Sequence, residues 1–463
     1  MRRSLRIASL VALITLAACA PPASAPPSSG PAPARGNATT QPAPSAPEPS
    51  AAEQRIVAGV RDDFDSAIAS LERTVNINSG TLNAAGVRRV AEAMRPDFER
   101  LGFTVRLAQV EGAGRGPHLI AERTGSQGLK LLLIGHLDTV FEEDSPFQRW
   151  ERVDSATARG PGVVDMKGGN TVILYALKAL HDAGALENTT VTVVLTGDEE
   201  APGRPLDASR RDLIAAGRRS DVALGFEGGS RDADGDLAVV ARRSSSGWRL
   251  DVTGRGAHSS GVFGADTGAG AIYEAARILD QFYEELRGDP GLTFNPGVIV
   301  GGSEAPYDAA ASRGTAFGKS NVVASSATVV GDIRTLSDEQ LERTRAAMGR
   351  IVGQNLPLTT ARITFTDSYP SMSAREENYA LLGIYDGISR ALGYGEVRAF
   401  DPAQRGAADV SFVAPLIPGM DGLGPQGSGS HTVEERVDLP SLRRATERAA
   451  LLIYRLTREG AEL

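Results

Sequence analysis

Cysteine and histidine are scarce in this chain of 463 residues. Cys19 is the only cysteine, which excludes a disulfide framework within the chain and a metal site built from cysteines. Histidine occurs only at positions 118, 136, 181, 258 and 431. Any metal site must therefore take its ligands from these histidines and from carboxylates.

A positive net charge and long hydrophobic segments are also missing. Lys and Arg number 49 and Asp and Glu number 57, so the formal net charge is −8. This balance argues against a nucleic-acid-binding protein held by a basic face. With 23% charged residues, the composition is not that of a multi-spanning membrane protein. Hydrophobic residues make up 41%, enough to bury cores, and the length predicts two or three domains.

At the N-terminus, three arginines precede an apolar segment at 7–18 that is too short to span a bilayer comfortably. Leu-Ala-Ala-Cys at 16–19 resembles a bacterial lipobox, in which the chain is cut before the cysteine and the cysteine is lipidated. We therefore predict a lipoprotein signal peptide at 1–18 and lipidation of Cys19. An ordinary signal peptide with an incidental cysteine is the alternative.

Residues 19–52 are rich in proline, alanine and serine and cannot bury a core. We predict that they form an extended linker between the membrane and a globular body. The protein is then exported and lipid-anchored to the bacterial cell envelope. In a Gram-negative host we expect the outer membrane, because Ala20 offers no inner-membrane retention signal.

Two kinds of pattern divide the globular body. Continuous apolar runs at 129–134, 190–195 and 222–226 alternate with helical patterns, which predicts an α/β sheet with helices on both faces. From 244 to 367 the order β-α-β-β-α-β predicts an inserted ferredoxin-like α+β unit. We therefore assign 53–243 and 368–463 to one domain and 244–367 to a second.

Acidic and imidazole side chains follow the predicted strands of the first domain. Because sites in open α/β sheets form at the carboxyl ends of strands, we expect these side chains to meet at one edge. Solvated surface loops are the alternative explanation for any single one of them. The clusters are His136 with Asp138, Asp165 before a helix, Asp198 with Glu199 and Glu200, and Glu227.

A cluster of carboxylates and imidazoles without cysteine suits zinc or another divalent ion. Asp138 lies two residues after His136 and can therefore stand behind its ring on the same side of the chain. Glu199 and Glu200 are neighbours whose side chains diverge, so one can bind metal while the other stays free for proton transfer.

Five motifs in order resemble the co-catalytic di-zinc metallopeptidases that include glutamate carboxypeptidase, peptidase T, succinyl-diaminopimelate desuccinylase and aminoacylase. The resemblance covers about residues 60–460. It implies a zinc-peptidase-like mixed sheet with helices on both faces and an inserted lid and dimerisation domain. The motifs lie at 135–140, 160–169, 198–200, 256–259 and 429–432, the last with Glu435.

The resemblance also implies the roles of the site residues. His136 and Glu227 would bind one of two divalent ions, with zinc expected, and Glu200 and His431 would bind the other. Asp165 would bridge the two ions. Among the remaining residues, Glu199 would be the general base and Asp138 would orient His136.

In the small domain the resemblance implies a third group of functional residues. His258 would reach a neighbouring subunit's active site and stabilise the oxyanion of the tetrahedral intermediate. Asn321 and Arg334 would hold the substrate's carboxylate, a task that suits the guanidinium fork of arginine. A homodimer is therefore expected.

The function that follows is metal-dependent hydrolysis of a peptide or amide bond next to a free carboxylate, as in a carboxypeptidase or dipeptidase. The substrate would be a small peptide or an N-acyl amino acid, and no nucleic acid is involved. An N-acyl-amino-acid deacylase is the alternative within this class. A peptide-binding lipoprotein without turnover and a two-metal phosphoesterase are less favoured alternatives, because a binder needs no second carboxylate beside a ligand and no basic cluster follows the strands.

Overall fold

The computed structural model describes residues 48–463 except 111, 113 and 310. The predicted signal peptide, Cys19 and the predicted linker up to residue 47 lie outside the described residues. The first helix, α1 (Ala51–Asp62), includes the last two residues of the predicted linker. It begins there because the Ser50 side chain accepts from the backbone N–H of Glu53, and the Glu53 carboxylate accepts from that of Ser50. In the described part of the chain, no helix has the length and apolar character needed to cross a membrane.

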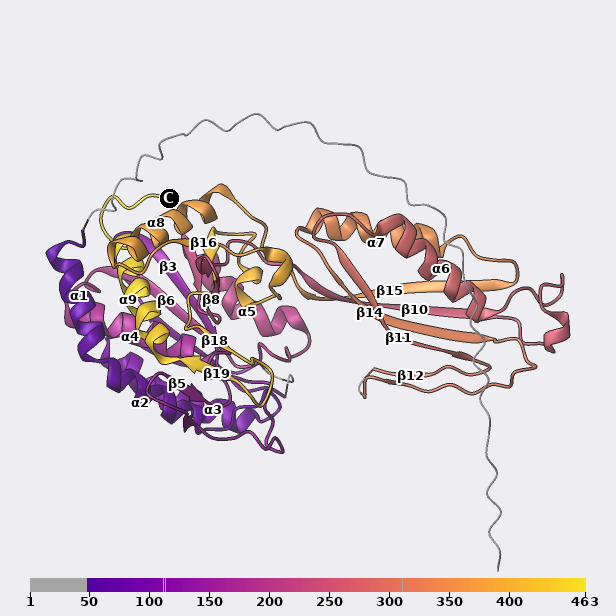
Figure 1. Ribbon diagram of the computed structural model, residues 1–463, viewed down its shortest axis with the longest axis horizontal. Helices are drawn as coiled ribbons and strands as arrows, with labels where there is room; N and C mark the ends of the chain where they lie inside the picture. The colour runs from indigo at the N-terminus through magenta and orange to yellow at the C-terminus, as the bar shows by residue number, and fades with distance from the viewer. Residues whose placement is uncertain (1–47, 111, 113, 310) are drawn as a thin grey trace, which may run out of the picture. The chain divides into compact units, whose positions relative to one another are not determined.

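The main sheet has six strands in the order β1-β2-β6-β3-β7-β17. Its central strands β3 and β6 are labelled in Figure 1. The strands β6, β3, β7 and β17 run parallel, and β1 and β2 pair antiparallel at one side. This mixed sheet confirms the predicted fold class. The strand bounds are β1 Thr104–Ala108, β2 His118–Arg123, β3 Gln127–His136, β6 Thr189–Thr196, β7 Val222–Gly225 and β17 Gly419–Met420.

Helices cover both faces of this sheet, as predicted. Along β3, Leu131 and Leu133 pack into the core that includes α4 and α9, while Leu132 and Ile134 pack into a second core against α5. This alternation buries the central strands on both faces. The helices are α2 Phe64–Val75, α3 Ala84–Arg100, α4 Lys167–Asp182, α5 Leu206–Gly217, α8 Glu376–Ala391 and α9 Leu439–Leu456.

The segment 244–367, called the small domain below, has a core of its own. Its four-stranded antiparallel sheet has the order β11-β14-β10-β15, with α6 and α7 completing the predicted β-α-β-β-α-β sequence. Trp248 on β10 packs edge-to-face on Phe282 of α6, with 5.9 Å between ring centroids. The bounds are β10 Ser245–Gly254, α6 Ala271–Leu286, β11 Thr293–Gly302, β14 Ser326–Arg334, α7 Asp338–Val352 and β15 Thr359–Tyr369.

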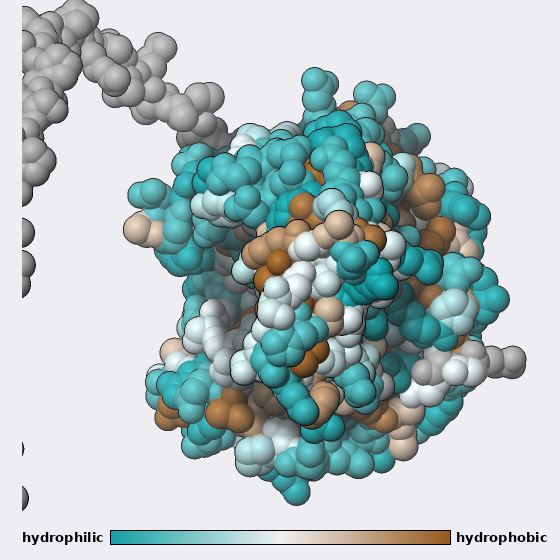
Figure 2. All heavy atoms as spheres, turned by 90° about the vertical axis from the view of Figure 1, so that its right-hand side faces the viewer, coloured by the Kyte–Doolittle hydropathy of each residue, from teal (hydrophilic) through white to brown (hydrophobic). Residues whose placement is uncertain are grey.

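Hydrophobic side chains remain exposed on the small domain. Tyr273 of α6 stacks at a tilt on Phe263, and Ile272 and Ile299 lie on α6 and the edge strand β11. Figure 2 shows a face on which hydrophobic residues form small groups among hydrophilic ones.

Two smaller sheets join distant parts of the main domain. The first has the order β18-β19-β5-β4 and the second β16-β9-β8. Their strands have two to four residues each, too short for the sequence pattern to predict. The bounds are β4 Glu151–Arg152, β5 Thr157–Arg159, β18 Gly427–Ser428, β19 Arg436–Asp438, β8 Ser230–Asp232, β9 Gly235–Ala238 and β16 Val397–Ala399.

Candidate metal centre

The predicted metal ligands converge at the carboxyl ends of parallel strands. His136 is the last residue of β3, Glu227 follows β7, and Glu200 follows β6. Asp165 lies just before α4, and His431 lies in the turn between β18 and β19. The structure therefore brings together all five residues that the sequence analysis named as ligands.

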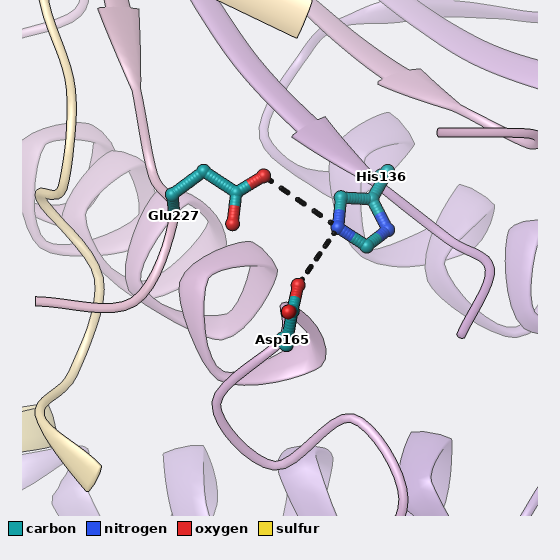
Figure 3. A group of neighbouring side chains, drawn as sticks. All are labelled: His136, Asp165 and Glu227. Carbon is teal, nitrogen blue, oxygen red and sulfur yellow. Dashed lines mark hydrogen bonds and ion pairs between the residues drawn. The ribbon is translucent and has the colours of Figure 1, made fainter. Parts of the chain in front are cut away.

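The five side chains form two groups of three, each with ligand atoms within 4.8 Å of one another. In the first group the Nε2 of His136 lies 3.2 Å from Asp165 Oδ1 and 3.6 Å from Glu227 Oε1 (Figure 3). In the second, the Nε2 of His431 lies 3.1 Å from Asp165 Oδ2 and 3.3 Å from Glu200 Oε2. Asp165 thus offers one oxygen to each group.

Charge and burial make the centre a site that attracts cations. Hydrogen bonds from His431 to the carboxylates of Asp165 and Glu200 raise its pKa to about 11. Burial opposes protonation of His136, yet its carboxylate neighbours raise its pKa well above the usual value. Burial raises the pKa of Glu227 to about 8, with the Asp165 charge adding to the effect. Without a metal, the chain therefore holds protons where cations would sit.

The donor set fits divalent ions. Each group offers imidazole nitrogen and carboxylate oxygen, the ligands that zinc and similar ions take when cysteine is absent. Glu200 Oε1 is buried and has no hydrogen-bond partner among the described residues. A buried carboxylate oxygen without a partner is costly unless an ion or a water satisfies it. Each group could therefore hold a divalent cation, and Asp165 is common to both groups.

Asp138 is fully buried behind His136, where the sequence analysis expected it. Its Oδ1 lies 3.3 Å and its backbone oxygen 3.1 Å from the Nδ1 of His136. The same carboxylate accepts hydrogen bonds from the Thr81 hydroxyl and from the backbone N–H groups of Glu199 and Glu200. One side chain thus fixes both the imidazole and the turn that carries the two glutamates.

Glu435 holds the loop that carries Asp165, the residue common to both ligand groups. This buried carboxylate accepts three backbone N–H groups, from Gly162 at 3.1 Å, Val164 at 2.8 Å and Asp165 at 3.0 Å. The motif pointed to Glu435, but its contacts are made with residues about 270 positions away in the chain, and no local pattern predicts them.

A buried ionic network under Glu199 was missed by the sequence analysis. Arg210 is fully buried and pairs with Asp198 at 2.6 Å and with Asp409 at 2.8 Å. It also donates to the Tyr369 hydroxyl, which in turn donates to the backbone oxygen of Glu199 at 2.6 Å. Arg210 lies in an arginine-rich segment, so nothing in the sequence singles it out.

A second buried pair supports Glu227. Asp421 accepts from the backbone N–H of Glu227 at 3.2 Å and forms an ion pair with Arg242 at 2.7 Å. Both side chains are buried, and they are far apart in the chain. Each of these networks fixes the backbone beside a predicted ligand or base.

The small-domain residues lie in two places. His258 is exposed, and its segment pairs with that of Asn321, whose backbone oxygen accepts from the N–H of Ser259 at 2.9 Å. Arg334 is the last residue of β14, where its side chain pairs with Asp332 at 3.1 Å. Among the hydrogen bonds and ion pairs of residues 48–463 (without 111, 113 and 310), none links these three side chains to the metal ligands.

The fold and the paired ligand groups define a metal-dependent peptidase or amidohydrolase. The model of the peptidase family M20/M25/M40 matches residues 132–455. The chain belongs to this family, which confirms the family that the motifs indicated.

Known proteins align over most of the chain. Carboxypeptidase G2 of Pseudomonas sp. (strain RS-16) is 28% identical over 404 residues, covering 85% of this chain and 90% of that protein. Succinyl-diaminopimelate desuccinylase of Methylorubrum extorquens (strain PA1) is 27% identical over 375 residues, covering 75% of this chain and 89% of that protein.

Solved structures share the fold. The aminopeptidase PepT from Bacillus cereus superposes with a TM-score of 0.62 and 17% identity, covering 84% of this chain and 98% of that one. A dinuclear metal-binding peptidase of the M20 family from Bacillus subtilis gives a TM-score of 0.59 and 16% identity, covering 86% and 99%.

Proposed function

We propose that this metallopeptidase hydrolyses a peptide or amide bond next to a free carboxylate, with two zinc ions and Glu199 as general base. The observation that carries this proposal is the pair of ligand groups sharing Asp165, with Glu199 beside Glu200 but in neither group. The alignment with carboxypeptidase G2 over most of the chain supports cleavage beside a carboxylate.

His136, Asp165 and Glu227 would hold one ion, and Glu200, His431 and Asp165 the other. When bound, such ions polarise the scissile carbonyl and lower the pKa of an attacking water. The Glu199 carboxylate takes a proton from that water and passes it to the leaving nitrogen. Burial raises the pKa of Glu199 well above the ordinary value, which suits a group that must both accept and return a proton.

We further propose that two subunits build each complete site. Asn321 precedes the first residue of β14, and Arg334 is its last residue. The strand's eight steps of rise span roughly 26 Å, so one subunit cannot place both side chains on one small carboxylate. Arg334 of one subunit and the segment of His258 and Asn321 from another can do so together. The exposed Ile272, Tyr273 and Ile299 supply an apolar surface for such a dimer.

An N-acyl-amino-acid deacylase is the second candidate, because one relative that aligns with this chain is named a succinyl-diaminopimelate desuccinylase, an enzyme that removes a succinyl group. Both candidates use the same residues and differ only in which side of the amide is recognised. Export and lipid anchoring through Cys19 remain part of the proposal. They are tested by following labelled fatty acid in wild type and Cys19→Ser in the native host.

The decisive experiment uses the soluble chain from residue 48 onward. The zinc-loaded and the chelator-treated protein are each incubated with dipeptides, N-acyl amino acids and folyl-glutamate-type amides. We expect turnover that is lost on chelation and restored by zinc. Turnover that persists at full rate without metal, or zinc-loaded protein that cleaves no amide in the panel, would contradict the proposal.

A further inference from the structure

A cavity of about 360 Å³ lies beside the metal ligands. Its lining includes Asp165, Glu227 and His431, and also Ser430 and Arg405. It shares Gly229, Ser230 and Gly427 with a second cavity of about 620 Å³, so the two adjoin. The space next to the ligands can therefore accept more of a substrate than the scissile amide.

Arg405 is the arginine that lines this space, and its backbone is fixed. It follows the short helix η2 (Pro402–Gln404), and its N–H donates to the backbone oxygen of Pro402 at 3.3 Å. The next carbonyl, that of Gly406, accepts from the buried Arg242 at 2.8 Å. The guanidinium is thus presented from an anchored turn.

The guanidinium of Arg405 has an N–H donor without a hydrogen-bond partner. Its Nη2 donates to the backbone oxygen of Gly228 at 2.6 Å, and its carbon stands 5.7 Å from the ring centre of Phe400. Its Nε is buried and lacks a hydrogen-bond partner, and no carboxylate of the described residues forms an ion pair with the side chain.

The neighbouring arginines differ in that each of them forms an ion pair with a carboxylate. Arg398 and Arg231 line the larger cavity, but Arg398 pairs with Asp232 and Arg231 with Asp236. Arg242 pairs with Asp421. Of these four arginines, Arg405 lines the cavity at the ligands and forms no ion pair with a carboxylate of the described residues. Leaving a buried charged donor unpaired is costly.

We infer that Arg405 binds a carboxylate of the substrate and selects substrates that carry a second acidic group. This inference rests on the proposed function, in which Asn321 and Arg334 hold the first carboxylate. A planar guanidinium suits a carboxylate because two of its N–H groups can donate in parallel. The second acidic group belongs either to the side chain of the leaving amino acid or to the acyl part.

Two pairs of substrates distinguish these sources. N-acetyl-L-glutamate and N-acetyl-L-glutamine differ in a carboxylate on the leaving side, and N-succinyl-L-alanine and N-butyryl-L-alanine differ in one on the acyl side. The zinc-loaded wild type should cleave the acidic member of one pair with a kcat/KM about 10- to 100-fold higher, the range of a hydrogen bond to a charged group.

Arg405→Gln should abolish that preference, and Arg405→Lys should keep part of it. The matched control is Arg398→Gln, which removes a paired arginine of the adjoining cavity and should keep the preference. Zinc content should be unchanged in all three variants. A preference that survives in Arg405→Gln, or its absence in both wild-type pairs, would overturn the inference.

Binding gives a readout that does not depend on turnover. Calorimetry on the zinc-loaded wild type should show tighter binding of glutarate than of glutaramate, and Arg405→Gln should bind the two equally. If no substrate is cleaved but this difference is present in the wild type and absent in Arg405→Gln, the proposed function fails while the anion site stands. Equal binding by the wild type would overturn the anion site itself.

Discussion

Replacing Glu435 by glutamine tests how the loop of the shared ligand is held. The amide oxygen can still accept from Val164 and Asp165, which both donate to Glu435 Oε1. The new NH₂ group faces the backbone N–H of Gly162, which now donates to Oε2 at 3.1 Å. One buried donor is left unpaired, which costs about 1–3 kcal/mol. With a total stability of roughly 5–15 kcal/mol, the variant still folds.

The consequence for metal binding is specific. Asp165 belongs to both ligand groups, so a displaced loop should weaken the binding of both ions. Loss of a supporting residue of this kind changes metal affinity by about 10- to 100-fold. Urea unfolding of the metal-free protein at pH 8 measures the first effect, and zinc competition with a chelator measures the second.

The neighbour Glu434 provides the control. Its exposed side chain pairs only with Arg436 among the described residues, so Glu434→Gln should change stability by less than about 1 kcal/mol. If Glu435→Gln lost stability but bound both ions with wild-type affinity, the loop would not be what sets the ligand geometry. Unchanged stability would show that the three hydrogen bonds do not matter.

Three further predictions concern the ligands, the pH dependence and the small domain. His136→Ala and His431→Ala should each bind about one ion per chain instead of two by metal analysis; two ions in both would contradict the assignment. Burial raises the pKa of Glu227 to about 8 and of Glu435 to about 7, so from pH 5 to 7 the folded metal-free chain holds protons that the unfolded chain releases. The melting temperature of the metal-free chain should fall from pH 5 to 7, and it should fall less in Glu227→Gln. An equal fall in both proteins would show that Glu227 is not a cause of the pH dependence. His258→Ala should lower kcat by roughly 10²–10³ with metal content intact, and an unchanged kcat would exclude an oxyanion role.

Much of the fold could be predicted because it depends on local signals. The run 129–134 is apolar at five of its six positions because β3 is buried on both faces, and Ser337 caps α7 through a hydrogen bond to the N–H of Gln340. The sequence pattern favours a helix from about residue 267, but α6 begins only at Ala271, because Gly268 and Gly270 take positive φ values of 69° and 82°. The sequence pattern favours a strand over 321–333, but β14 begins only at Ser326, and an isolated bridge between Val322 and His258 precedes it.

The residues of the site could also be predicted only where a local sequence signal marks them. His136 and Glu227 could be placed because His136 ends one recognisable strand and Glu227 follows another, and parallel strands bring their ends together. The Arg210 network and Arg405 could not, because their side chains donate to Asp198, Asp409 and Gly228, which lie 12, 199 and 177 positions away. An arginine side chain that becomes buried also has no distinguishing pattern in the sequence. Long-range polar pairing is set by the packed fold.

In the proposed mechanism, Glu199 is the group that moves the proton. Glu199→Gln keeps the size of the side chain and both ligand groups, so the variant should still bind two ions per chain. Its kcat on the best amide substrate should fall by about 10²–10⁴, the usual contribution of a general base. A variant that carries two ions and turns over at nearly the wild-type rate would contradict the account.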